Sequence, residues 1–193
     1  MKSVCVFLGS SPGNCPAYGE AAIALGKLLA AREISLVYGG AKNGLMGVLA
    51  QAVVAAGGRA VGVLPAFLKA KELAFDGLSE LHEVESMHER KAKMAELSDG
   101  FIAMPGGIGT LEEFFEVATW GQLGLHAKPA GFFNAQGYFD KLDGFLDHMV
   151  EQGFLKRLHR TNIMSSQDPA ELLDLMESFK PAVLGKWHGL EKS

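Results

Sequence analysis

The chain has 193 residues, of which 48% are hydrophobic and 21% charged, and its formal net charge is −4. This length and balance predict one soluble globular domain with its own core. The sequence has no dense basic run and no apolar stretch near the ~20 residues that cross a bilayer, so we expect neither nucleic acid nor a membrane as partner.

The first apolar run, residues 4–8, is shorter than the ~7–15 residues at the centre of a signal peptide. We therefore interpret it as a buried strand. The two cysteines, Cys5 and Cys15, form no C-x-x-C pair and no disulfide framework, which predicts a cytoplasmic protein.

Short β-rich runs then alternate with segments of helical periodicity. Strands are predicted at residues 4–8, 35–38, 60–64, 81–85, 100–103, 130–133 and 162–164, with helices at 17–32, 45–56, 87–97, 110–124, 138–152 and 169–179. Several strands are continuous apolar runs, as in sheets that helices cover on both faces. The fold class is therefore α/β, a Rossmann-like doubly wound parallel sheet. We expect a single nucleotide-binding domain with its core at about 3–180 and a loosely held tail at 187–193.

Three loops rich in glycine or serine follow predicted strands, at residues 9–13, 39–44 and 105–110. Ligands of doubly wound sheets bind outside the carboxyl ends of the strands, so all three loops should lie on one rim. Glycines let a backbone approach a ligand closely. This convergence predicts a ligand site that includes Ser11, Gly39 and Gly40.

The first of these loops, Gly9-Ser10-Ser11-Pro12-Gly13, matches the G-x-S-x-G pattern of a nucleophile elbow. In that elbow the residue after the serine donates its N–H to the oxyanion. Pro12 has no N–H, which argues against a Ser11 nucleophile and leaves a turn or a nucleotide contact. Dinucleotide binding is also disfavoured, because Glu112 stands where a third glycine should be, and no Walker A sequence occurs.

The third loop can cradle a phosphate. Its glycines leave N–H groups open, and the helix expected from Thr110 directs its positive end at the same place. Thr110 can add a hydroxyl. A second interpretation stays open, since Thr110-x-x-Glu113 also has the spacing of a capping box.

A predicted helix upstream, rich in charged residues, bears on the choice between phosphate binding and helix capping. Met87, Arg90, Met94 and Leu97 recur at helical spacing and share one apolar stripe. An arginine on such a face needs an anionic partner, which Glu113 or a bound phosphate can supply. Lys91 lies off the stripe and is either solvated or in reach of a ligand at the rim.

The histidines show no spacing typical of a metal site. They are His82, His88, His126, His148, His159 and His188. We expect no metal, and the chemistry considered below requires no organic cofactor either.

The segment from Pro105 to Glu113, with Met87-His88-Glu89-Arg90-Lys91 before it, resembles the signatures of the "Lonely guy" family, the cytokinin riboside 5′-monophosphate phosphoribohydrolases. That family's pattern reads P-G-G-x-G-T-x-x-E with an upstream R-K, and some relatives carry a lysine decarboxylase label. The resemblance covers residues 4–179. It implies a homodimer with its active site near the interface, and hydrolysis of an N6-modified AMP to the free base and ribose 5-phosphate.

The resemblance places the catalytic arginine on Arg90 and the catalytic glutamate on Glu113. The full set of predicted substrate-binding residues is Ser11, Gly39, Gly40, Glu72, Met87, Arg90, Lys91, Gly106, Gly107, Ile108, Gly109, Thr110, Leu111, Glu112, Glu113 and Thr119. The segment around Glu72 matches the family pattern least closely.

Two other functions stay open from the sequence. One is an AMP nucleosidase that acts on unmodified AMP. The other is a protein that binds a nucleotide without turnover, such as a molybdenum-cofactor carrier. The presence of both Arg90 and Glu113 favours an enzyme.

Overall fold

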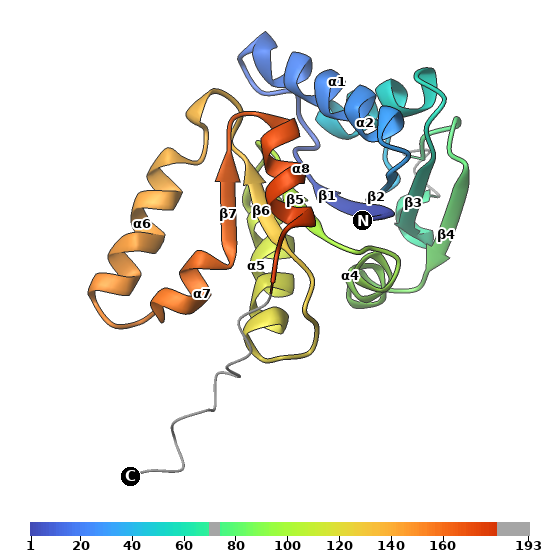
Figure 1. Ribbon diagram of the computed structural model, residues 1–193. Coiled ribbons are helices and arrows are strands. Elements are labelled where there is room, and N and C mark those ends of the chain that lie inside the picture. Colours follow the sequence, from blue (N-terminus) through green and yellow to red (C-terminus); the bar gives the residue numbers. More distant parts are fainter. Residues whose placement is uncertain (70–73, 181–193) are drawn as a thin grey trace.

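The structure is a computed structural model that describes residues 1–69 and 74–180 (Figure 1). Strands and helices alternate along this part of the chain. The strands are β1 Ser3–Phe7, β2 Ser35–Tyr38, β3 Ala60–Pro65, β4 Glu80–Val84, β5 Phe101–Ala103, β6 Ala130–Phe133 and β7 Ile163–Ser166. The helices are α1 Pro16–Ala31, α2 Gly44–Ala55, α3 Ala66–Lys69, α4 Met87–Glu96, α5 Ile108–Gln122, η1 Ala135–Gly137, α6 Asp140–Glu151, α7 Arg157–Thr161 and α8 Pro169–Glu177.

The described strands form one parallel sheet in the order β4-β3-β2-β1-β5-β6-β7. The chain winds outward from β1 to β4 and then returns to place β5 on the other side of β1. This reversal makes a topological switch point between β1 and β5, where doubly wound sheets bind ligands. The predicted fold class is confirmed.

Helices cover both faces of the sheet, as Figure 1 shows. Helices α1, α2 and α8 pack on one face, over buried side chains such as Leu36 and Leu173. Helices α4, α5 and α6 pack on the other, over a cluster that includes Phe114 and Phe132. Gly26 lets α1 and α2 approach closely, because a Cβ there would lie 2.8 Å from the Cβ of Ala52.

The predicted elements are all present, and the strands at 35–38 and 130–133 have the predicted bounds. Helix bounds differ from the predicted ones by one or two residues at starts and ends. Helix α5 begins two residues before Thr110, and α6 begins two residues after Tyr138 because a hydrogen-bonded turn precedes it. The short helices α3 and α7 were not predicted. The tail at 187–193 lies outside the described residues. No helix of the described ranges is long and apolar enough to span a membrane.

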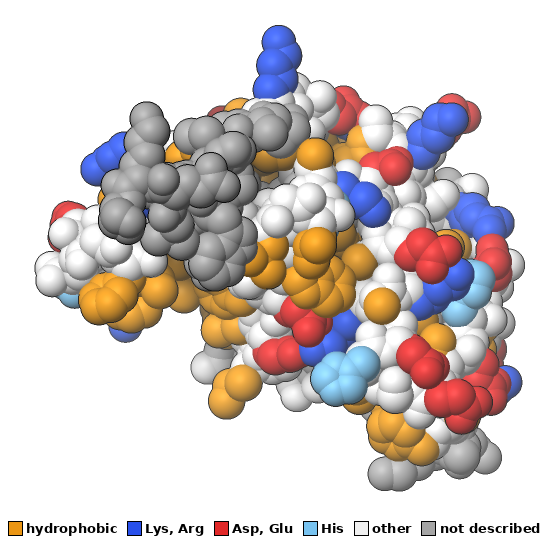
Figure 2. Space-filling model, turned by 90° about the horizontal axis from the view of Figure 1, so that it is seen from below, with side chains coloured by type: hydrophobic (Ala, Val, Ile, Leu, Met, Phe, Trp, Pro, Cys, Tyr) orange, Lys and Arg blue, Asp and Glu red, His pale blue; other side chains and the backbone are white. Residues whose placement is uncertain are grey.

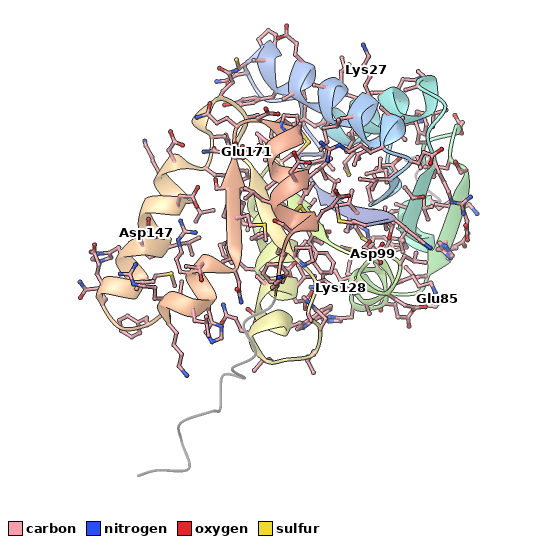
Figure 3. All side chains as sticks on the ribbon, in the orientation of Figure 1. Lys27, Glu85, Asp99, Lys128, Asp147 and Glu171 are labelled. Carbon is pink, nitrogen blue, oxygen red and sulfur yellow. The ribbon has the colours of Figure 1, made fainter. Side chains whose placement is uncertain are left out.

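Hydrogen bonds from side chains link neighbouring segments at the end of the sheet where the strands begin. The carboxylate of Asp99, labelled in Figure 3, accepts from the N–H of Lys2 at 2.7 Å and of Ser3 at 3.1 Å. Lys128, also labelled there, donates to the carbonyl of Ala95 at 2.7 Å. Side chains of both charges are interspersed on the face seen in Figure 2. The glycine-rich loops lie at the opposite end.

Candidate active site

The loops after β1, β2 and β5 meet at the switch point and are tied together through their backbones. The N–H of Gly9 donates to the carbonyl of Pro105 at 3.1 Å, and the N–H of Leu45 donates to the carbonyl of Gly9 at 3.1 Å. Gly44 has φ +57°, and a Cβ there would lie 2.3 Å from the carbonyl carbon of Ser10. Only glycine therefore fits this crossing of two loops. The predicted convergence on one rim is confirmed.

Two hollows open at this rim and share Ser10 and Gly107. One, of 280 Å³, lies between the loop after β1, the Pro105-Gly106-Gly107 segment and Tyr138. The other, of 250 Å³, is lined by Leu8, Ser10, Met46, Met87, Arg90, Gly107, Gly109, Thr110, Glu112 and Glu113. The residues predicted to be catalytic thus face a hollow that borders the glycine-rich loop at residues 105–110, called the phosphate loop below after its predicted ligand.

The phosphate loop leads into α5 without a side-chain cap. Gly107 is the N-cap residue, and no side chain accepts a hydrogen bond from the first turn. The capping-box interpretation of Thr110 and Glu113 is therefore wrong: Thr110 lies inside the helix, and Glu113 bonds elsewhere. Thr110 is only 4% exposed, yet its hydroxyl has no hydrogen-bond partner among the described residues. The N–H groups at the start of α5 and this hydroxyl can all serve an anion.

Arg90 and Glu113 form a buried ion pair. Nη1 of Arg90 donates to Oε1 of Glu113 at 3.1 Å, and the two side chains are only 11% and 13% exposed. Nε of Arg90 donates to the carbonyl of Val63 at the end of β3, also at 3.1 Å. The inward arginine and its predicted anionic partner are confirmed by this geometry, which fixes the guanidinium from two sides.

Gly39 makes room for that guanidinium. A Cβ at Gly39 would lie 1.9 Å from Nη2 of Arg90, so every other residue would displace it. Gly40 has φ +74°, and its carbonyl accepts from the N–H of Phe75 at 3.0 Å. The two glycines after β2 thus shape the loop around Arg90. Nη2 itself donates to no described residue, so it can reach a ligand.

The pKa of Glu113 is raised above the ordinary glutamate value. Burial is the largest cause, because it disfavours the charged carboxylate. The guanidinium of Arg90 opposes this effect, and the carboxylate of Glu112 adds to it. The pKa of Glu113 therefore lies closer to neutral pH than that of a solvated glutamate.

Lys91 is buried, contrary to the idea that it is solvated. Its Nζ bonds Oε1 of Glu112 at 2.5 Å and Oε2 of Glu116 at 2.9 Å, and its side chain is 8% exposed. Burial alone would lower the pKa of Lys91, but hydrogen bonds to Glu112 and Glu116 outweigh it and raise the pKa. In this arrangement the ammonium of Lys91 forms ion pairs with two carboxylates.

The structure brings nine of the sixteen predicted site residues to the two hollows, and the other described ones line neither. Gly106 and Ser11 line the first hollow, and the second contains seven others of the set. Thr119 is exposed on α5, about 14 Å along the helix from Thr110, and lines neither hollow. Glu72 lies outside the described residues. Ser10, Met46 and Tyr138 were missed, although each follows a strand end of the same rim.

Two other chemistries find no support in the described part of the chain. Ser11 is exposed and has no hydrogen bond to a described residue, so no base activates it as a nucleophile. The described residues contain no cluster of three or more His, Cys, Asp or Glu side chains that could hold a metal ion.

Comparison with known proteins relates the whole chain to one group of enzymes. The family described as "possible lysine decarboxylase" matches residues 46–176. A probable cytokinin riboside 5′-monophosphate phosphoribohydrolase of Oryza sativa subsp. japonica is 49% identical over 180 residues, which are 93% of this chain and 79% of that protein. A cytokinin riboside 5′-monophosphate phosphoribohydrolase of Arabidopsis thaliana is 48% identical over 93% of this chain and 84% of its own length.

Solved structures share the fold at lower identity. The molybdenum cofactor binding protein of Rippkaea orientalis has a TM-score of 0.70 at 22% identity, covering 92% of this chain and 97% of that chain. The molybdenum cofactor carrier protein of Chlamydomonas reinhardtii has a TM-score of 0.68 at 18% identity, over 91% and 96%. These likenesses establish the architecture.

The raised pKa of Glu113 predicts a pH-dependent contribution to stability. The folded chain holds this proton at pH values where the unfolded chain has lost it, so its contribution to the free energy of unfolding falls as pH rises from about 4.5 through the raised folded pKa. In Glu113→Gln that titration is absent. Urea unfolding at a series of pH values should show the free energy of unfolding of wild type minus that of the variant decreasing across this window. A difference that stays flat or increases contradicts the assigned direction.

Proposed function

The chain belongs to the family described as possible lysine decarboxylases, among its cytokinin riboside 5′-monophosphate phosphoribohydrolases, and from this we propose that it hydrolyses the N-glycosidic bond of N6-substituted AMP. The products are the free base, a cytokinin, and ribose 5-phosphate. The observation that carries the proposal is the buried Arg90–Glu113 pair, which faces the same hollow as the open start of α5.

Two kinds of group in the site contact different parts of the nucleotide. The N–H groups from Gly106 to Thr110 and the hydroxyl of Thr110 bind the 5′-phosphate, because they are donors at a helix N-terminus. This anchor holds the ribose beside Glu113. The free Nη2 of Arg90 contacts the ligand, while Nη1 keeps Glu113 in register.

Cleavage passes through a cationic sugar, as in O-glycoside hydrolysis. The carboxylate of Glu113 stabilises that cation, orients the ribose hydroxyls or activates the water that adds to the anomeric carbon. The bond to the base breaks, the base takes up a proton, and water supplies the new hydroxyl. This chemistry needs no cofactor.

The family description does not suit the lysine at this site. An amine that attacks a carbonyl must lose its proton, and lysines that do so have lowered pKa values. Lys91 is held as an ammonium by Glu112 and Glu116, and its pKa is raised. A role in binding, next to Glu112, fits Lys91 better than a covalent one.

Two alternative functions receive less support. An AMP nucleosidase would use the same phosphate loop and the same ion pair, but the names of the plant relatives favour N6-substituted substrates. A molybdenum-cofactor carrier shares the fold, but at 22% identity that likeness carries no argument on function. A carrier also has no evident need for a buried glutamate with a raised pKa.

We also propose a homodimer in the cytoplasm. Support comes from a positive mean hydropathy of +0.14, from the free cysteines Cys5 and Cys15, and from Ile108, the first residue of α5, which is 87% exposed. A second chain would cover Ile108 and could give the exposed Thr119 a role. Analytical ultracentrifugation should find a dimer. A stable monomer with full activity would contradict the assembly, and the catalytic proposal would survive it.

Substrate comparison tests the proposed function directly. Isopentenyl-AMP, AMP and adenosine are incubated with the purified protein, and free base is measured by chromatography. We expect isopentenyl-AMP to be cleaved with the highest kcat/KM, and adenosine to be far poorer than AMP, because charge-assisted contacts to phosphate contribute about 1.5–3 kcal/mol each. Preference for AMP would indicate the nucleosidase, and binding without free base would indicate a carrier.

Neutralising Glu113 tests the catalytic assignment. Glu113→Gln keeps the shape of the side chain but removes the charge that stabilises the cation, so kcat should fall about 10²–10³-fold while the protein stays folded. The matched control is Glu112→Gln, one residue away, on a side chain that is 54% exposed. It should retain more activity than Glu113→Gln. Near-normal turnover by Glu113→Gln would remove Glu113 from the mechanism.

A further inference from the structure

The turn between β6 and α6 is held rigidly at the same rim. The side-chain oxygen of Asn134 accepts from the N–H of Phe139 at 2.6 Å, and its Nδ2 donates to Oδ1 of Asp140 at 2.7 Å. The N–H of Asn134 donates to the carbonyl of Ser166 at the end of β7, at 2.8 Å. This network fixes both ends of the segment between β6 and α6.

The backbone inside this turn is in an unfavourable conformation. Gln136 has φ 57°, in the left-handed region that residues with a Cβ avoid, and Gly137 follows with φ 67°. Such conformations persist where the surrounding structure enforces them, and they cluster at functional sites. The residue that comes directly after them is Tyr138.

Tyr138 reaches from this turn onto the phosphate loop. Its hydroxyl donates to the carbonyl of Gly106 at 2.6 Å. Its ring meets Tyr18 edge-on with centroids 5.7 Å apart, and Phe139 with centroids 5.0 Å apart. The ring is therefore supported by two aromatic neighbours, and the hydroxyl is held against one backbone carbonyl.

That contact determines where a neighbouring N–H points. In a trans peptide the C=O and the following N–H point in opposite directions, so holding the carbonyl of Gly106 directs the N–H of Gly107 the other way. The bond from Gly9 N–H to the carbonyl of Pro105 does the same for the N–H of Gly106. Neither N–H donates to an acceptor within the described residues.

The loop needs such a contact because glycines flank the peptide. Gly106 and Gly107 can each populate both signs of φ, so this peptide plane can rotate at little cost. A Cβ at Gly107 would meet nothing within 4 Å, whereas one at Gly106 would lie 2.2 Å from the hydroxyl oxygen of Thr110, so the peptide is packed on one side and open on the other. An external hydrogen bond is then the means of holding the donor in place before the ligand arrives.

We propose that Tyr138 is a positioning residue, which holds the Gly106–Gly107 peptide so that the Gly107 N–H faces the 5′-phosphate. This inference rests on the proposed function, since it assigns the anion at the loop to the phosphate of the nucleotide. It also accounts for the strained turn, whose geometry delivers the tyrosine hydroxyl to one carbonyl oxygen.

The test is Tyr138→Phe, which removes the hydroxyl and keeps the ring. Ribose 5-phosphate, AMP and adenosine are titrated by calorimetry, and the melting temperature and the KM and kcat for AMP are measured in parallel. We expect the Kd of ribose 5-phosphate and the KM for AMP to rise about five- to ten-fold, as for the loss of one oriented donor, with kcat and the Kd of adenosine within two-fold of wild type. Tyr18→Phe makes the same chemical change on a hydroxyl that bonds no described residue.

The outcomes separate this inference from the proposed function. An unchanged Kd for ribose 5-phosphate in Tyr138→Phe overturns it. So does an equal loss for adenosine, which would mark a merely structural role, and so does an equal effect of Tyr18→Phe. Failure of the wild-type protein to bind ribose 5-phosphate removes the phosphate cradle and this inference together. Selective loss of phosphate binding, in a protein that releases no base from any nucleotide, supports Tyr138 and overturns only the hydrolase.

Discussion

The buried pair of Arg90 and Glu113 is the constraint on which the site depends. Two charges removed from water are costly unless each has additional partners. Arg90 obtains a second acceptor from Val63, and it fits only because Gly39 has no Cβ. The pair also ties α4 to α5, two helices that follow strands from opposite sides of β1. Loss of either charge would leave the other buried without its counter-ion.

The two halves of the site, the phosphate loop and the Arg90–Glu113 pair, are held in place by different kinds of interaction. The phosphate loop is built from backbone, and its donors are directed by bonds that the carbonyls of Pro105 and Gly106 accept from the N–H of Gly9 and the hydroxyl of Tyr138. The half proposed to be catalytic is built from side chains, among which burial raises the pKa of Glu113. Binding of phosphate and cleavage of the base therefore respond differently to pH and to substitution.

The sequence predicted the fold, and it offered Glu113 or a bound phosphate as the partner of Arg90. Continuous apolar strands located the sheet, and the helical stripe through Met87 and Met94 showed that Arg90 turns inward. Contacts between distant segments were harder to foresee. Lys91 lies off that stripe, and its burial follows from Glu112 and Glu116 across the helix interface. Tyr138 was missed because its role depends on a strained turn, which no periodicity in the sequence reports.

The start of α5 differs from the starts of α4 and α8, although α1, α2 and α6 also begin without a side-chain cap. At α4, Ser86 accepts from the N–H of Glu89 at 3.1 Å, and at α8, Asp168 accepts from the N–H of Ala170 at 2.8 Å. These helices satisfy their first turn with their own side chains. Helix α5 has Gly107 as its N-cap residue and no such acceptor, and it starts at the switch point, where the field of the helix is directed into the hollow. The unsatisfied N–H donors of the first turn lower the stability of the helix unless an anion accepts from them. The uncapped start that weakens the free helix therefore favours the binding of a phosphate.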